Sequence, residues 1–337
     1  MKLTTEQIIA AANGIIRTEQ NELGLELHRF SRTQEGFFYQ THPLYCRESF
    51  FNGYFGRNCR TCAGVTLDFV CDAEEINITF GRIEATNDST GQKFDLYVDG
   101  EFARTFEVER DLRYGASGES KLHYEASGEV HRYVLYLPYF AFPIISGVEL
   151  VGAGVYEPRK REAELLFLGD SITQGVGAAH PANTYVCRAA RHLDVGILDQ
   201  ANSGFVYDAG SLERVCDPKV VVTAYGINDY GRKSLEQLED QTREYLEKVR
   251  ILYPDAVLVS ILPLWTVWNG ENENYRVAER ACLKRLYEEL SDVVVDGHEM
   301  MPHDSKYLSD QVHPNDDGYA CYGENLSTVL RKVLGNL

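Results

Sequence analysis

Five short runs of apolar residues recur through the second half of the chain, and they restrict the fold more than any other feature of the sequence. Each run consists mainly of Val, Leu and Ile, without the polar alternation of a strand that has one face in water. Such runs are typical of parallel strands covered on both faces. They lie at residues 165–168, 195–198, 220–224, 257–262 and 293–295.

Helical patterns separate these runs. Apolar residues recur at helical spacing from Tyr185 to Leu193 and again from Leu235 to Leu252. This alternation of strand and helix predicts an α/β fold, a doubly wound domain with five parallel strands. In such a sheet the active site lies beyond the carboxyl ends of the strands, so the residues that follow each run are the candidates for chemistry.

The first half of the chain has a different pattern. Its runs are short and alternating or β-branched, and turn signals such as Asp99-Gly100 separate them. After a helix that begins with a capping box at Thr4 and Gln7, they predict an antiparallel β-sandwich. The expected strands lie at 64–69, 76–80, 93–98, 105–108 and 133–137.

A charged run that contains a proline, residues 157–162, separates the two patterns and is the expected linker. We therefore expect an N-terminal helix and sandwich domain at 1–156, a linker at 157–163 and a second domain at 164–337.

The first strand of the second half is followed by Gly169-Asp170-Ser171. Ser171 would stand at the turn into a helix, with its hydroxyl exposed and its own N–H pointing into the site. An ordinary N-cap serine is the alternative, because serine is common at that position. The motif alone leaves both interpretations open.

The next two strands are followed by groups that can stabilise a negatively charged oxygen. Gly204 lets the backbone present an N–H with no side chain in the way. Asn228, in Gly226-Ile227-Asn228-Asp229, can donate from its amide without carrying charge. A simple turn at Gly204 and a helix cap at Asn228 or Asp229 are the alternatives.

A carboxylate and an imidazole stand three residues apart in Asp310-Gln311-Val312-His313, late in the chain. At this spacing Asp310 can accept a hydrogen bond from Nδ1 of His313 and leave Nε2 free to face Ser171. A plain loop histidine is the alternative, since the chain has 9 histidines. His298 and His303 compete for the role, but neither follows an aspartate at this spacing.

Together these residues supply a nucleophile (Ser171), a base (His313), an orienting carboxylate (Asp310) and an oxyanion hole. The oxyanion donors are the N–H groups of Ser171 and Gly204 and the side-chain amide of Asn228. Acyl transfer through a serine requires this combination of groups.

The same residues carry a family resemblance. Gly169-Asp170-Ser171, Gly204, Gly226-Ile227-Asn228-Asp229 and the pair Asp310 and His313 resemble, in order, the four blocks of the SGNH (GDSL-like) hydrolases. The resemblance covers about residues 164–337. It implies a three-layer α/β/α fold related to flavodoxin, a serine esterase activity and a structural role for Asp170.

The front half is similar to the jelly-roll-like β-sandwich domains that precede some bacterial carbohydrate esterases of this family. Phe94-Asp95-Leu96-Tyr97 is similar to part of a Gly-x-Asp-Leu-Tyr signature of such domains, with Lys93 in place of the glycine.

We expect hydrolysis of short-chain acyl esters, acetyl esters above all, and the resemblance implies a carbohydrate carrier. Trp265 and Trp268 follow the fourth strand, where they could stack on a sugar or cap an acyl pocket; packing in the core is the alternative. A thioesterase or lysophospholipase is the enzymatic alternative. A glycan-binding protein on a catalytically silent scaffold is the alternative from another class.

Charge and hydropathy limit the classes of partner and substrate that the chain can bind. The chain has 51 acidic and 33 basic residues, for a net charge of −18, which repels phosphate backbones and anionic lipids. We therefore expect a small-molecule or carbohydrate ester as substrate, and neither a nucleic-acid nor a membrane partner. The first residues lack the pattern of a signal peptide, and the most apolar stretch, 133–148, is too short to span a bilayer, so a cytoplasmic location is expected.

The chain has 8 cysteines, which we expect to be reduced thiols because no export signal is recognised. Cys59 and Cys62, with Cys46 and Cys71 nearby, could form a zinc site. Only one pair is close in sequence, so buried thiols are the favoured interpretation. The esterase mechanism needs no metal or organic cofactor, and none is expected.

Overall fold

The computed structural model describes residues 1–41, 53–86, 93–107, 120–272 and 274–337. The chain forms two compact units. The first contains Met1–Arg29, Arg60–Glu162 and His180–Ala182; the second contains Phe30–Cys59, Ala163–Ala179 and Asn183–Leu337. The segment Phe30–Cys59, far upstream in sequence, thus packs with the second half of the chain.

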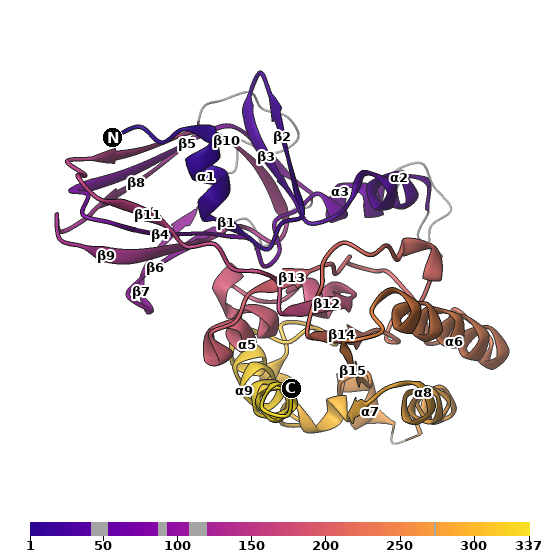
Figure 1. Ribbon diagram of the computed structural model, residues 1–337. Helices are drawn as coiled ribbons and strands as arrows, with labels where there is room; N and C mark the ends of the chain where they lie inside the picture. Colours follow the sequence, from indigo (N-terminus) through magenta and orange to yellow (C-terminus); the bar gives the residue numbers. More distant parts are fainter. Residues whose placement is uncertain (42–52, 87–92, 108–119, 273) are drawn as a thin grey trace. The chain divides into compact units, whose positions relative to one another are not determined.

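The first unit is an antiparallel β-sandwich, as expected (Figure 1). One sheet has the order β1-β4-β9-β6-β7, with β11 paired to β4, and the other has the order β2-β3-β10-β5-β8. One apolar core lies between them and includes the buried rings of Phe69, Phe80, Phe94 and Phe142. The elements are α1 (Thr5–Ala11), β1 (Ala12–Asn13), β2 (Arg17–Asn21), β3 (Gly24–His28), β4 (Thr66–Cys71), β5 (Glu75–Ala85), β6 (Lys93–Val98), β7 (Glu101–Glu107), β8 (Ser120–Glu125), β9 (His131–Tyr136), β10 (Ala141–Val151) and β11 (Tyr156–Pro158).

Each of the five strands expected in this half overlaps an observed strand, although Val108 lies outside the described residues. The expected linker is held on the sandwich: Tyr156–Pro158 pairs with β4, and Asn13 donates from Nδ2 to the carbonyl oxygen of Arg159 at 2.9 Å. The side-chain oxygen of Asn13 accepts from the N–H of Arg161 at 2.7 Å. The chain therefore stays with the first unit through Glu162.

The second unit contains the parallel sheet. Its strands are β12 (Leu165–Gly169), β13 (Ile197–Asp199), β14 (Val220–Ala224), β15 (Val257–Ile261) and β16 (Val293–Val295), in the order β13-β12-β14-β15-β16. This is the flavodoxin-like order 2-1-3-4-5, whose topological switch point lies between the first and third strands. The residues that follow β12 and β14 therefore face one crevice.

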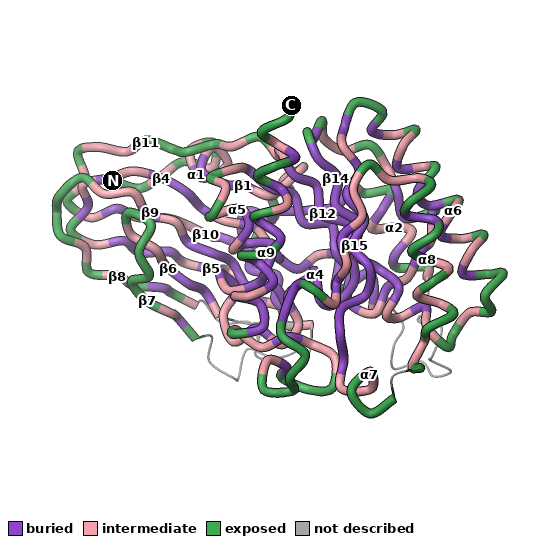
Figure 2. The backbone as a smooth tube through the Cα atoms, turned by 90° about the horizontal axis from the view of Figure 1, so that it is seen from below, coloured by how far each residue is buried: buried purple, intermediate pink, exposed green. Residues whose placement is uncertain are grey.

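Helices cover both faces of this sheet and make it three-layered, as expected. The helices α5 (Tyr185–Leu193) and α9 (Asp316–Leu334) pack together on one side, and α6 (Leu235–Leu252) and α8 (Val277–Leu290) on the other (Figure 1). Every residue of β12 is buried, whereas α6 and α8 turn exposed outer faces to solvent (Figure 2). Among its described residues, the unit also contains the shorter helices α2 (Arg32–Gln40), α3 (Tyr54–Cys59), α4 (Ser171–Gln174) and α7 (Val267–Glu271).

The cysteines of the possible zinc site are packed in the interior. Cys59, Cys62 and Cys71 are buried, and burial raises the pKa of the Cys62 thiol to about 12, which opposes the thiolate that a metal needs. Cys46 lies outside the described residues. Within the described part of the chain, no helix is long and apolar enough to cross a bilayer.

Candidate active site

Ser171 begins the short helix α4 directly after β12. Asp170 is its N-cap, and its Oδ1 accepts a hydrogen bond from the N–H of Ile172 at 3.0 Å. The first N–H groups of a helix have no partner within the helix, and that of Ser171 donates to none of the described residues. Gly169 is required by close approach, because a Cβ there would lie 2.0 Å from Oγ1 of Thr173.

His313 lies against the Ser171 hydroxyl. Its Nε2 is 2.9 Å from Oγ of Ser171, and its Nδ1 is 2.7 Å from Oδ2 of Asp310. The other oxygen of Asp310 accepts from the N–H groups of Val312 and His313, each at 2.7 Å. Partial burial opposes ionisation of Asp310, but the hydrogen bonds from His313 and from the backbone outweigh it and hold the pKa well below its usual range. Asp310 is therefore a fixed negative charge behind the imidazole.

Side chains of α9 hold α4 and the residues that follow it. The hydroxyl of Tyr319 donates to the carbonyl oxygens of Ile172 and Val176, at 2.9 and 2.7 Å. Asp316 accepts from the N–H of Ala179 at 2.7 Å. Sequence reasoning missed these supports, although their position in the first turn of the helix after His313 is a usable signal.

Gly204 lies in a tight turn after β13. The N–H of Phe205 donates to the carbonyl oxygen of Asn202 at 3.0 Å, and Gly204 has a φ of +79°, which suits the third position of a type II turn and favours glycine. The N–H of Ser203 donates to Oε1 of Gln174 at 2.7 Å, which joins the turn to α4. Among the described residues, the N–H of Gly204 has no acceptor.

Asn228 follows β14 and reaches both neighbouring blocks. Its Nδ2 lies 3.1 Å from the carbonyl oxygen of Phe205 and 3.3 Å from Oδ2 of Asp170. Burial raises the pKa of Asp170 to about 7, against the lowering effects of the Ile172 N–H and of His313. Asp170 thus both caps α4 and holds the Asn228 amide near Ser171.

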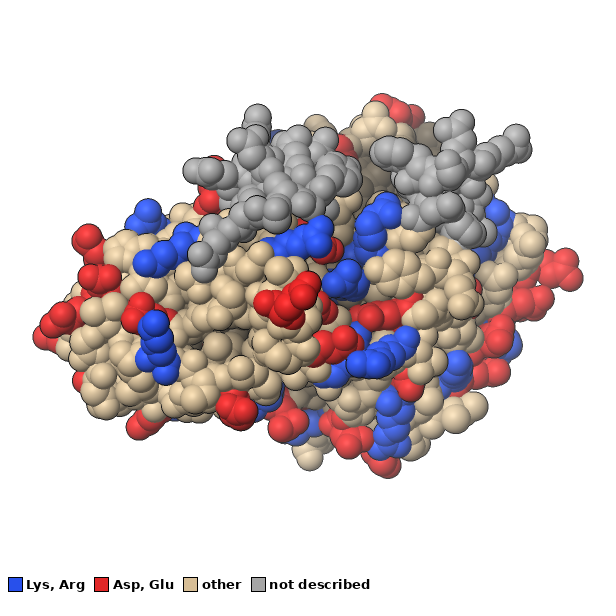
Figure 3. Space-filling view, turned by 90° about the horizontal axis from the view of Figure 1, so that it is seen from above, with Lys and Arg blue, Asp and Glu red and all other residues tan. Residues whose placement is uncertain are grey.

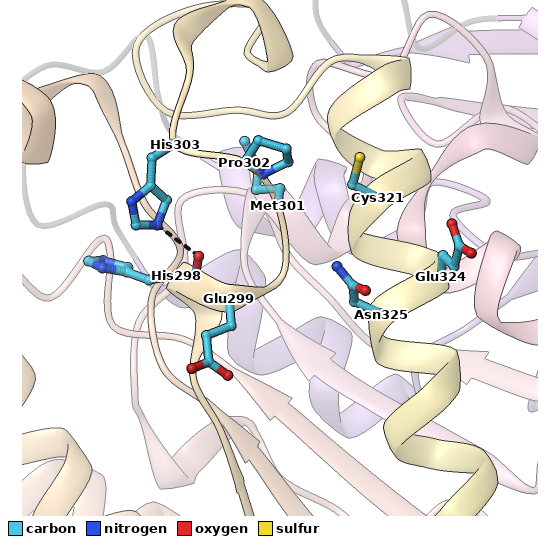
Figure 4. Close-up of a pocket in the computed structure, with 8 residues that line it drawn as sticks. All are labelled: His298, Glu299, Met301, Pro302, His303, Cys321, Glu324 and Asn325. Atoms are coloured by element: carbon cyan, nitrogen blue, oxygen red, sulfur yellow. Dashed lines mark hydrogen bonds between the residues drawn. The ribbon is translucent and has the colours of Figure 1, made fainter.

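The competing histidines lie in a different place. His298 and His303 line a separate pocket of about 410 Å³, together with Cys321, Glu324 and Asn325 of α9 (Figure 4). His303 donates from Nε2 to the carbonyl oxygen of His298 at 2.8 Å. Burial and the Arg280 charge lower the pKa of His298 to about 4. Of the three candidates, His313 is the histidine in contact with Ser171.

The two tryptophans differ in their packing. Trp265 is buried and stacks on His303, with ring centroids 5.4 Å apart. Trp268, on α7, packs against Tyr275 at 5.6 Å. The N–H of Val267 donates to the carbonyl oxygen of Gln311 at 3.1 Å, so this segment adjoins the Asp310–His313 loop. A substrate-binding role for Trp265 and Trp268 stays a prediction.

Comparison with known proteins gives one family match. Residues 167–321 match the model of the GDSL-like Lipase/Acylhydrolase family, a range that contains Ser171, Gly204, Asn228, Asp310 and His313. None of the curated proteins compared with the chain matches it.

Several solved structures are similar to this chain over most of its length. A salicylyl-acyltransferase, SsfX3, from a tetracycline biosynthetic pathway is 17% identical, with a TM-score of 0.72 over 94% of this chain and 92% of its own. A family two carbohydrate esterase from Clostridium thermocellum, in complex with cellohexaose, is 18% identical, with a TM-score of 0.61 over 81% of this chain and 93% of its own. An acetyl xylan esterase from the rumen bacterium Butyrivibrio proteoclasticus is 16% identical, with a TM-score of 0.58 over 81% and 90%. At these identities the likeness concerns the fold.

Proposed function

Residues 167–321 belong to the GDSL-like lipase/acylhydrolase family, which makes the chain a carboxylic ester hydrolase, and we propose that it works as a serine esterase with Ser171 as nucleophile. The observation that carries the proposal is the line of contacts from Oγ of Ser171 through His313 to Asp310, at 2.9 and 2.7 Å. In this arrangement Nε2 of His313 is the base and Asp310 orients the imidazole.

The reaction has two halves. Nε2 of His313 takes the hydroxyl proton while Oγ of Ser171 attacks the ester carbonyl carbon, and the carbonyl oxygen becomes an oxyanion. When this intermediate collapses, His313 returns the proton to the leaving alcohol and an acyl-serine remains. A water that gives its proton to His313 then attacks the acyl group, and the proton passes back to Oγ of Ser171 as the acid is released.

The oxyanion hole consists of the N–H groups of Ser171 and Gly204 and the amide of Asn228. Preorganised donors of this kind contribute about 3 kcal/mol each to the transition state. The Asn228 amide nitrogen makes two contacts, and the one to Asp170, at 3.3 Å, is longer than the one to the carbonyl oxygen of Phe205. In the proposed mechanism the amide hydrogen that faces Asp170 is therefore the one donated to the oxyanion. Side chains and backbone handle each proton and charge, so the proposed mechanism uses no metal or organic cofactor.

The proposed substrate is a short acyl ester, above all an acetyl ester, on a carbohydrate. The similar solved proteins that are named as a carbohydrate esterase and an acetyl xylan esterase support this class, as does the β-sandwich of the first unit. The net charge of −18 favours a neutral substrate. Acidic and basic side chains are interspersed on the face drawn in Figure 3, as expected of a protein whose target is not a phosphate backbone.

The test is covalent labelling of Ser171 by a fluorophosphonate, followed by assay on p-nitrophenyl esters of increasing chain length. The wild-type protein should be labelled and Ser171→Ala should not, while Ser127→Ala, a change at an exposed serine, should behave like the wild type. An unlabelled wild-type protein that hydrolyses no ester would establish the silent scaffold instead. Acetyl esters should exceed octanoyl esters in kcat/KM by at least tenfold, which is ~1.4 kcal/mol of differential transition-state binding. A preference for octanoyl esters would overturn the proposed substrate and leave the serine mechanism standing.

A further inference from the structure

The segment Phe30–Cys59 lies outside the range that matches the hydrolase family, yet it belongs to the second unit. Its helices α2 and α3 pack against the residues that follow β13, where the Gly204 turn lies. These residues form an irregular stretch with one short 3₁₀ helix, Ala209–Ser211, before β14 begins at Val220. Most of the stretch belongs to no helix or strand, so contacts with other segments contribute to its conformation.

Helix α2 holds this stretch at its start and near its middle. The side-chain amides of Gln34 and Gln200 form a reciprocal pair, with each nitrogen donating to the other's oxygen at 3.2 and 3.1 Å. Gln34 also donates to the carbonyl oxygen of Ser211 at 3.0 Å. Both glutamine side chains are buried, so neither amide can exchange its partner for bulk water.

Helix α3 holds the turn itself. Asn202 is fully buried, and its Nδ2 donates to the carbonyl oxygen of Phe55 at 2.9 Å. The N–H of Asn202 donates to the carbonyl oxygen of Gly169, also at 2.9 Å, two residues before Ser171. Asn202 therefore connects α3, the Gly204 turn and the strand that carries the nucleophile.

Aromatic rings fix the other end of the turn. The ring of Phe205 is buried and meets Phe38 and Phe55 edge-on, with centroids 5.0 and 5.1 Å apart. The carbonyl oxygen of Phe205 accepts the 3.1 Å hydrogen bond from Asn228. The turn thus carries the N–H of Gly204 and also orients the side-chain amide of Asn228.

We propose that α3 is a positioning element of the oxyanion hole and that Asn202 is the positioning residue through which it acts. The proposal rests on the serine esterase function above. Asn202 does not touch the substrate: it fixes the turn Asn202–Phe205, and the turn sets where the Gly204 N–H and the Asn228 amide point. Because these donors act mainly on the transition state, a small displacement lowers kcat more than it changes KM.

The main experiment compares Asn202→Ala with the wild type in the full chain, on p-nitrophenyl acetate. We expect kcat to fall about 10- to 100-fold, KM to stay within about twofold and the rate of fluorophosphonate labelling to fall with kcat. The acid midpoint of the pH profile should not move, because Ser171, His313 and Asp310 keep their contacts. A rise in KM with kcat intact would overturn the proposal.

Asn13→Ala is the matched control, because Asn13 is also buried and also donates to a backbone carbonyl at 2.9 Å, that of Arg159 in the sandwich. It should lower the melting temperature as Asn202→Ala does and leave kcat within about twofold. If Asn202→Ala lowers only the melting temperature, its role is structural and the proposal fails. If Asn202→Ala does not fold, Phe205→Leu is the second variant. It keeps the backbone carbonyl of Phe205 and removes the aromatic contacts of the turn. An unchanged kcat in Phe205→Leu also overturns the proposal. A wild-type protein with no esterase activity and no labelling would instead refute the proposed function itself.

Discussion

Asp170 stands beside the nucleophile in an environment that disfavours its charge. The side chain is buried, and burial raises its pKa from 3.8 to about 7, while the Ile172 N–H and His313 act in the opposite direction. The folded protein therefore retains a proton on Asp170 between about pH 4 and 7 that the unfolded chain has released. Stability falls as pH rises through this window, because the unfolded state binds fewer protons there.

Asp170→Asn removes this titration, so the variant should gain stability relative to the wild type as pH rises from 5 to 8. The gain approaches a few kcal/mol, at ~1.4 kcal/mol for each unit of pKa shift. Urea unfolding of both proteins across this range measures it. Asp304→Asn is the control: the N–H of Lys306 donates to Oδ1 of Asp304 and lowers its pKa, so this carboxyl does not titrate between pH 5 and 8 and the variant should run parallel to the wild type there. Parallel curves for the wild type and Asp170→Asn would show that Asp170 is ionised throughout.

Substitution can distinguish which of the three candidate histidines is the catalytic base. His313→Ala should lower kcat/KM by about 10³-fold or more, because no other described histidine contacts Ser171. His298→Ala and His303→Ala should stay within a few-fold of the wild type, since both residues line the separate pocket and neither contacts Ser171. Steady-state kinetics on p-nitrophenyl acetate distinguishes the three. Full activity of His313→Ala together with a large loss in either other variant would reassign the base.

At the scale of elements, the turn between β14 and α6 rests on a buried ion pair. Nζ of Lys233 lies 2.6 Å from Oδ1 of Asp229, with 5% and 0% of the two side chains exposed. Lys233 also donates to the carbonyl oxygen of Tyr207 at 3.0 Å. Burial raises the pKa of Asp229, and the Lys233 charge opposes that shift. This pair anchors the turn directly after Asn228.

Lys233→Met should destabilise the protein by roughly 3–5 kcal/mol, because it leaves the Asp229 carboxylate buried without its partner. Lys284→Met is the matched control: Lys284 pairs with Glu288 at the same sequence spacing, but both side chains are 55% exposed. An exposed pair of this kind contributes about 0.3–0.5 kcal/mol. Denaturant unfolding at pH 7 measures both changes. Equal losses would mean that Asp229 is not held by Lys233.

The elements that sequence reasoning found are those with a local signal. β12 and β14 are apolar runs buried on both faces, so their ends, and with them Ser171 and Asn228, were predictable. The capping box at Thr4 and Gln7 is present as predicted. β10 was missed because it continues the apolar run of β9 across Pro138 and Pro143, and β2 because its residues are polar and half-buried or exposed. The contact from Phe55 to Asn202 spans 147 residues and has no local signature.

At the scale of the whole molecule, the division of the chain in space differs from its division in sequence. The sequence places a boundary near residues 157–163, but the second unit includes Phe30–Cys59. Removal of everything before residue 163 would remove Phe38 and Phe55, which pack against the Phe205 ring. It would also leave the side chains of Gln200 and Asn202 without their hydrogen-bond partners. Newly exposed apolar surface and unpaired buried polar groups both oppose folding.

We therefore expect a truncated chain of residues 163–337 to be insoluble or to lack esterase activity. A second chain, in which residues 30–59 are joined by a flexible Gly/Ser linker to residue 163, should recover solubility, because it restores the contacts of α2 and α3. If the second chain is active and the truncated chain is not, esterase activity requires residues 30–59 and does not require the sandwich. Soluble yield, circular dichroism and hydrolysis of p-nitrophenyl acetate compare the two chains. A soluble and fully active chain of residues 163–337 would show that the hydrolase unit folds without residues 30–59. The role that we assign to this upstream segment would then be wrong.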